Sequence, residues 1–173
     1  MNNFDRVLLS NALIDLVISS QFESLETDHM QVLAVCCSDP QEFQDSHLAE
    51  SWFKVFQKAK DYLLVTLCDP DLCDQGLIIL HNFLTADSLR YQVYDDAREI
   101  FSKSLELLFS GESDICKQKF KEYLQSKVIL KGAQSGDNSL KKFFKALFIR
   151  FKDEQGGIFE QNKLGEVLTE LSA

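Results

Sequence analysis

The sequence predicts an all-α fold. Only two prolines and seven glycines punctuate its 173 residues, whereas an all-β protein of this size would need many more turn residues between short strands. Apolar residues recur at spacings of three and four along most of the chain, which is the periodicity of amphipathic helices. The hydrophobic content of 45% and the charged content of 26% are typical of a globular protein with a sizeable core. We therefore expect a single domain over residues 1–173, with about eight helices packed as helical hairpins.

The first part of the chain contains two helices and two similar corners. An apolar stripe over residues 3–20 predicts a largely buried helix, and Thr27 can cap a second helix that runs to the cysteine pair at 36–37. The corners are Ser38-Asp39-Pro40 and Cys68-Asp69-Pro70. In each, the aspartate can cap free amides and the proline takes the first helical position, so each corner ends one helix and begins the next.

The middle of the chain predicts three more helices. A long helix over residues 46–67 carries an apolar stripe that faces a partner helix. Residues 77–84 are apolar almost all round, which indicates a central helix covered on several sides. Asp87 or Ser88 caps the next helix, and Gly111 ends it.

The last third predicts helices over residues 113–131, 139–152 and 159–172, with a polar loop over 132–138. The loop is rich in residues that favour turns.

The two Asp-Pro corners are 30 residues apart, and each follows an apolar run, at residues 32–35 and 63–67. This spacing resembles the helix-pair rhythm of armadillo and HEAT repeats over residues 1–131, although no repeat consensus matches. The resemblance implies an α-solenoid whose stacked helix pairs leave a concave face for partners. An irregular helical bundle is consistent with the same helices, so both arrangements stay open.

Residues 147–171 resemble an EF-hand, with an aromatic helix, a twelve-residue loop over 152–163 and a second helix from Leu164. Gly157 and Phe159 occupy the glycine and apolar positions of the family's loop. Three positions where the family has oxygen ligands carry other residues, namely Lys152, Gly156 and Lys163. Two ammonium groups in place of carboxylates would repel calcium. The resemblance therefore implies a metal-free helix-loop-helix, and we expect no metal or cofactor.

Charge is sharply segregated along the chain. The net charge is −9, yet residues 117–152 hold 10 basic and 2 acidic side chains, a local charge of +8. Within that segment, the helix over 139–152 has phenylalanines and leucines on one face and most of its basic residues elsewhere, which makes it a basic amphipathic helix. One interpretation puts the phenylalanine face in the core and the lysines in solvent. The other makes the segment a surface for an acidic protein, an anionic membrane or phosphates.

No catalytic motif with recognisable spacing occurs in the sequence. The five cysteines form no CxxC pair, so neither a disulfide framework nor a zinc site is indicated, and we expect most of them to be buried apolar side chains. One alternative is an enzyme in which Cys73, Asp74 and His81 supply a nucleophile and a base, since such groups need only be neighbours in space. The simpler interpretation of His81 is a partly buried histidine bonded to a carbonyl.

The apolar runs fall well short of the ~20 residues that span a bilayer. The N-terminal apolar stretch is flanked by Asp5 and Asp15 without a basic region before it, which is not the pattern of a signal peptide. We therefore expect an intracellular protein, cytoplasmic or nuclear.

Together these features predict a non-catalytic protein–protein interaction domain, a scaffold or adaptor within a larger helical-repeat protein, whose partner has an acidic surface or an amphipathic helix. The candidate partner-binding residues are Lys117, Lys121, Lys141, Lys142, Lys145 and Arg150 in the basic segment, and Trp52 and Phe56 on the long helix. A second hypothesis is a membrane-surface or lipid-regulated adaptor whose residues 139–152 lie on anionic headgroups. Nucleic acid fits less well, because the aromatic residues of that helix share its apolar face and do not stand among the lysines.

Overall fold

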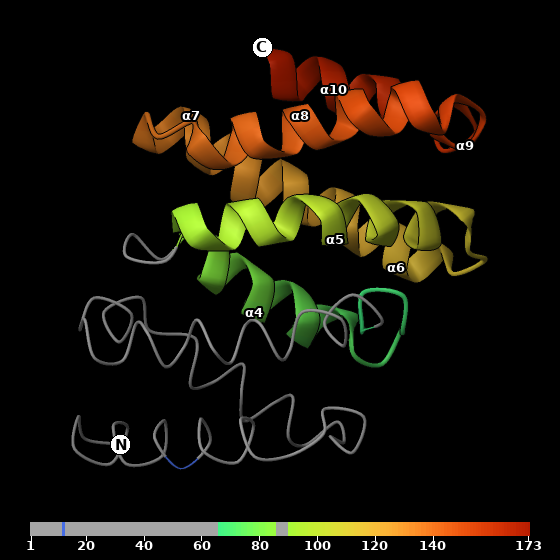
Figure 1. Cartoon of the computed structure of the whole chain (residues 1–173), viewed down its shortest axis with the longest axis horizontal. Coiled ribbons are helices and arrows are strands. Elements are labelled where there is room, and N and C mark those ends of the chain that lie inside the picture. The colour runs from blue at the N-terminus through green and yellow to red at the C-terminus, as the bar shows by residue number, and fades with distance from the viewer. Residues whose placement is uncertain (1–11, 13–65, 86–89) are drawn as a thin grey trace.

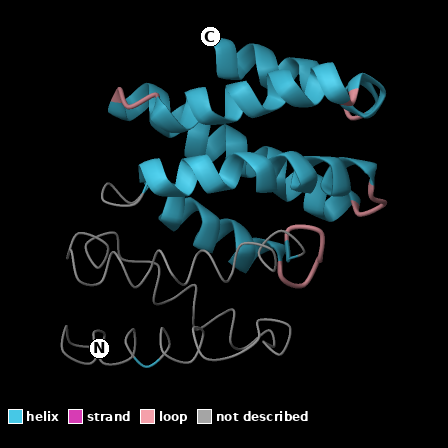
Figure 2. Cartoon of the chain, in the orientation of Figure 1, coloured by secondary structure: helices cyan, strands magenta, loops and turns pink. Residues whose placement is uncertain are grey.

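The computed structural model describes residues 12, 66–85 and 90–173 (Figure 1). Within these ranges every regular element is helical and no strand occurs (Figure 2). The predicted all-α fold is therefore confirmed for this part of the chain. The first two expected helices, the corner at 38–40, and Trp52 and Phe56 on the long helix lie outside the described residues.

The structure divides the described residues into short and medium helices joined by brief connections. Their bounds are α4 Cys73–Thr85, α5 Arg90–Ser110, α6 Asp114–Tyr123, the π-helix η3 Leu124–Leu130, α7 Lys131–Ser135, α8 Ser139–Glu154, α9 Gly156–Gln161 and α10 Leu164–Ser172. The expected helix over 139–152 is thus α8, two residues longer at its end.

The helices α4, α5, α8 and α10 form successive layers in chain order (Figure 1). Helix α5 contacts α4, α6, α8 and α9, and helix α8 contacts α5, η3, α9 and α10. A single hydrophobic cluster runs through all these layers, from Leu67 before α4 to Leu171 in α10. Helices α5 and α8 therefore form the middle of the described part, and the surface between them is shaped by residues 50 positions apart in sequence.

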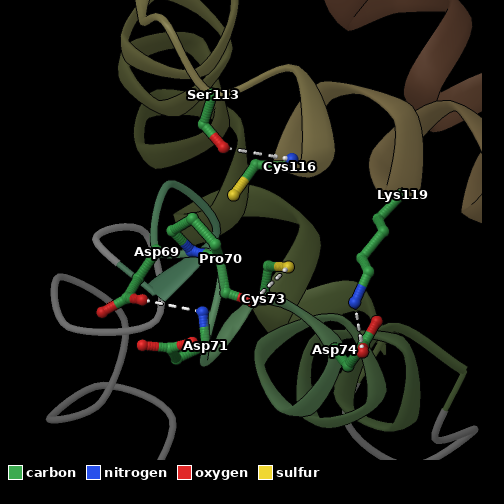
Figure 3. A network of polar contacts seen from close by, with 8 residues as sticks. All are labelled: Asp69, Pro70, Asp71, Cys73, Asp74, Ser113, Cys116 and Lys119. Carbon is green, nitrogen blue, oxygen red and sulfur yellow. Dashed lines mark hydrogen bonds and ion pairs between the residues drawn. The ribbon is translucent and has the colours of Figure 1, made fainter.

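The Asp69-Pro70 corner forms a turn in front of α4 (Figure 3). The Oδ1 atom of Asp69 accepts the backbone N–H of Asp71 at 2.9 Å, and its carbonyl accepts the N–H of Cys73 at 2.9 Å. The predicted capping role of the aspartate is confirmed. The predicted position of the proline is wrong, because residues 70–72 form turns and regular helix begins at Cys73. The aspartate side chain satisfies one amide of the turn, and regular helix starts after that turn.

The predicted helix over 113–131 is interrupted by the π-helix η3 and then continues through α7 to Ser135, which shortens the expected loop to residues 136–138. Besides Tyr123, its buried positions are four residues apart, at Cys116, Phe120, Leu124, Val128 and Gly132. In a regular α-helix, a spacing of four drifts by about 40° per step around the axis. The wider turn of a π-helix corrects this drift, so one face of the element stays on the core.

The predicted final helix over 159–172 is divided into α9 and α10. Lys163 separates them with a left-handed φ of 54°, a conformation that ends a helix. The side-chain amide of Asn162 donates to the carbonyls of Phe109 at 3.0 Å and Ile158 at 2.8 Å. Asn162 thereby ties the junction to the end of α5. The interval 152–163, expected as a loop from the EF-hand resemblance, contains the end of α8 and the whole of α9.

Candidate functional site

The apolar face of the basic helix α8 belongs to the core. Its buried side chains are Phe143, Phe144, Leu147, Phe148 and Phe151. Phe144 is 0% exposed and packs edge-to-face against Phe120, Tyr123 and Phe143, with ring centroids 6.3, 6.1 and 5.3 Å apart. The interpretation of this face as core is confirmed, and only the polar side of α8 is open to a ligand.

A groove between α5 and α8, with a volume of about 340 Å³, collects cations over an apolar floor. We call it the basic groove, and its lining residues are Tyr94, Arg98, Ser139, Lys142, Phe143, Ala146, Leu147 and Arg150. The three cations come from one turn of α5 and two turns of α8. The side chain of Tyr94 stacks on Phe143 at 4.6 Å with an interplanar angle of 26°. No carboxylate is among these lining residues.

One cation of the basic groove has an ionic partner among the described residues, and two do not. Arg150 donates to Glu154 at 2.9 Å, an exposed pair one helical turn apart, which contributes little stability. Arg98 and Lys142 are exposed and have no ionic partner within the part of the chain that the structure describes.

A second cavity, of about 520 Å³, adjoins the basic groove, and we call it the His81 pocket. It is lined by residues from α4, α5, η3, α7 and the start of α8, including His81, Lys127 and Lys131. Tyr94 and Ser139 line both hollows. The groove and the pocket therefore share two lining residues, and we call the two together the depression.

His81 is half-buried and bonded to a buried tyrosine. Its Nδ1 lies 3.0 Å from the hydroxyl of Tyr123, and the two rings meet edge-to-face at 5.5 Å. Burial, together with the charges of Lys127 and Lys131, lowers the pKa of His81 to about 4. Burial also raises the pKa of Tyr123, as does the nearby Tyr94. At neutral pH the imidazole is thus uncharged and the phenol keeps its proton. The expected carbonyl partner of His81 is wrong, since the partner is a hydroxyl.

The predicted partner-binding residues are not all in one place. Lys142 and Arg150 line the basic groove. The ammonium of Lys141 donates to the main-chain oxygen of Ala173 at 2.6 Å, so it helps to hold α10 on α8.

The remaining predicted lysines lie away from the groove. The ammonium of Lys121 donates to the carbonyl of Asn162 at 3.0 Å and ties α6 to the α9–α10 junction. Lys117 and Lys145 are half-buried and line neither the basic groove nor the His81 pocket. Two of the six basic candidates therefore belong to the depression.

The alternative site of Cys73 and His81 is not assembled. The two residues are eight positions apart on α4, about 12 Å along its axis. Cys73 is 1% exposed and donates to the carbonyl of Pro70 at 3.7 Å (Figure 3). Burial and the neighbouring Cys116 raise the pKa of the Cys73 thiol to about 11, the opposite of an activated nucleophile. Asp74 is paired with Lys119 at 2.5 Å.

Among the described residues, no three His, Cys, Asp or Glu side chains are grouped so that they could hold a metal ion.

Sequence reasoning missed Arg98, Lys127 and Lys131. Arg98 stands alone among acidic residues, but it follows Tyr94 by four positions, which places both on one face of α5. Lys127 and Lys131 are also four positions apart, within the segment of charge +8. Helical spacing could have paired these residues, whereas their meeting with α8 depends on tertiary packing.

Comparisons with protein-family models, with curated proteins and with solved structures find no significant match to this chain. In the residues that the structure describes, no helix is both long and apolar enough to cross a membrane. The function is therefore argued from the depression alone.

Proposed function

We propose that this chain is a non-catalytic protein-interaction domain that binds an acidic segment of a partner protein in the basic groove. One observation carries the proposal: the groove gathers Arg98, Lys142 and Arg150 around an apolar floor, and no described lining side chain is a carboxylate. An anionic occupant would be electrostatically complementary to these cations.

The lining suggests the form of the occupant. The floor contains Tyr94, Phe143 and Leu147, which offer apolar contact area to a side chain from the partner. The guanidinium groups of Arg98 and Arg150 can each bind a carboxylate through two hydrogen bonds. A partner helix or extended segment with an apolar anchor flanked by aspartates or glutamates satisfies both requirements.

The wider charge distribution supports the same partner. Residues 117–152 carry a charge of +8 in a chain whose net charge is −9. An acidic segment is attracted to this region and repelled by the rest of the molecule, which favours one approach direction. The layering of α4, α5, α8 and α10 in chain order (Figure 1) also supports a helical-repeat scaffold that continues as part of a larger protein.

The membrane-surface alternative is less well supported. An interfacial helix buries its apolar face among lipids, but the phenylalanine face of α8 is buried in the protein core. Contact with a membrane would be limited to headgroup electrostatics, which salt screens strongly.

The proposal can be tested with a fluorescent amphipathic peptide that has an acidic face. Fluorescence anisotropy measures the affinity of this peptide for the protein. Lys142→Glu and Arg98→Glu should each weaken binding about tenfold, because each loses a charged contact and adds repulsion. The matched control is Lys103→Glu, since Lys103 is also an exposed helical lysine and lines neither the groove nor the pocket. Circular dichroism first establishes that all variants are folded.

Equal affinities for wild type, Lys142→Glu and Lys103→Glu would refute the proposed groove. Co-sedimentation with vesicles containing anionic lipid is the second arm. If the wild type binds vesicles in physiological salt and Lys142→Glu abolishes that binding, while no acidic peptide binds, the membrane alternative replaces the protein partner.

A further inference from the structure

We propose that the His81 pocket binds a phosphoryl group, carried by a phosphorylated side chain of the acidic segment in the basic groove. The inference extends the proposed function, because it rests on that segment for the source of the phosphoryl group. Its geometric basis is that Lys127, Lys131 and His81 line one cavity, which shares the lining residues Tyr94 and Ser139 with the groove.

The two lysines supply the positive charge. Lys127 comes from η3 and Lys131 begins α7, so the change from π-helix to α-helix falls between them. Both are exposed, neither has an ionic partner within the described residues, and both act electrostatically on the His81 ring. The one carboxylate among the described lining residues, Asp137, accepts the backbone N–H of Ser139 through Oδ1 at 3.0 Å. The described lining therefore has two ammonium groups and one carboxylate, and its net positive charge favours an anion.

The histidine supplies a neutral donor. Tyr123 is buried and its hydroxyl has one partner among the described residues, the Nδ1 of His81. We assign the hydroxyl as the donor of this bond, because a buried phenol normally donates its proton to a neighbouring acceptor. The imidazole is then the tautomer protonated on Nε2, and that N–H is a donor for a ligand. Lys127, Lys131 and this N–H together provide three donors for the three acceptor oxygens of a phosphoryl group.

Charge and size favour phosphate over a carboxylate. A phosphorylated side chain carries close to two negative charges at neutral pH, whereas a carboxylate carries one. Two ammonium groups are therefore better matched by the phosphoryl dianion. The volume of about 520 Å³ lies within the usual range of ligand pockets, roughly 300–1,000 Å³, and leaves room for the side chain that bears the phosphate.

The first experiment uses inorganic phosphate alone and follows the ¹⁵N signals of the His81 imidazole by NMR. Phosphate should shift these signals, while chloride at the same ionic strength should not. The shift should be lost in the double variant Lys127→Gln/Lys131→Gln and kept in Lys103→Gln, which removes a lysine elsewhere. It should also be kept in Lys142→Glu, which disables the basic groove alone. An unchanged response in the double variant would overturn the phosphoryl site.

The second experiment compares the acidic peptide with its phosphoserine form. The phosphorylated peptide should bind the wild type about tenfold more tightly, and Lys127→Gln/Lys131→Gln should remove this advantage without weakening the unphosphorylated peptide. Equal binding of the two peptides, with a phosphate response at His81, would overturn the assignment to a partner's side chain in favour of a free phosphate compound. Failure of both peptides to bind, with the phosphate response intact, would instead overturn the proposed function.

Discussion

Acidification from pH 7 to pH 5 should destabilise the protein through His81, and His81→Asn should remove this effect. The imidazole is half-buried, next to two lysines and bonded to Tyr123. Protonation at Nδ1 would break the bond donated by the tyrosine and add a third cation to the pocket. Asparagine keeps an acceptor close to the position of Nδ1 but does not titrate.

The magnitude follows from the two pKa values. The pKa is 6.5 in the unfolded chain and about 4 in the folded protein. Since the folded pKa is lowered, the unfolded chain binds the proton more readily between these values, and stability falls as the pH falls. The contribution is fully present above pH 6.5 and lost below pH 4. The full loss is about 3 kcal/mol, of which about 2 kcal/mol falls between pH 7 and pH 5.

Urea denaturation at pH 7 and at pH 5 measures the loss in each protein. Other groups that titrate in this range are common to both proteins and cancel in the comparison. The free energy of unfolding of the wild type should fall by about 2 kcal/mol more than that of His81→Asn. If both proteins lose the same stability, His81 is not held neutral and the description of the pocket is wrong.

Three further substitutions test the packing, each by urea denaturation. Gly76→Ala places a Cβ atom 2.5 Å from the Oγ1 of Thr66. The overpacking should cost about 1–3 kcal/mol of stability and outweigh the gain of about 1 kcal/mol in helix propensity. If adding Thr66→Ala does not restore the lost stability, this contact is not the cause. Asn162→Ala should cost about 1–3 kcal/mol, because the carbonyl of Phe109 loses its donor, and a neutral result would mean that water replaces it. Phe144→Ala should cost about 3–5 kcal/mol, whereas a loss under about 1 kcal/mol would be inconsistent with a fully buried ring.

The helices were predictable because their signals are local. The phenylalanine stripe of 139–152, the cap at Ser113 and the stop at Gly111 are all short-range patterns, and the structure has a helix boundary at each. The division at Lys163 was not predictable in the same way. A lysine in the left-handed conformation has no local signal, and the bond that holds the junction joins Asn162 to Phe109, 53 positions earlier.

The depression was predictable only in part for the same reason. Charge counting selected the segment 117–152, which contributes Lys142 and Arg150 to the groove. It could not select Arg98, because α5 contacts α8 only in the folded structure, and α6, η3 and α7 separate the two helices in sequence. Nor could it tell Lys141 from Lys142, which are adjacent in sequence. One binds the main chain of Ala173, and the other faces the groove.

Some cations of the basic segment contact other groups of the protein, whereas others border the depression. Lys119 is paired with Asp74, Lys121 and Lys141 donate to carbonyls, and Lys152 lies 5.9 Å from the ring centre of Phe159. The cations that border the depression are Arg98, Lys127, Lys131, Lys142 and Arg150. Of these, only Arg150 has an ionic partner within the described residues. Like charges held close together repel one another, and a bound anion would reduce this repulsion. This is the physical reason why we propose the binding site there and not along the whole basic segment.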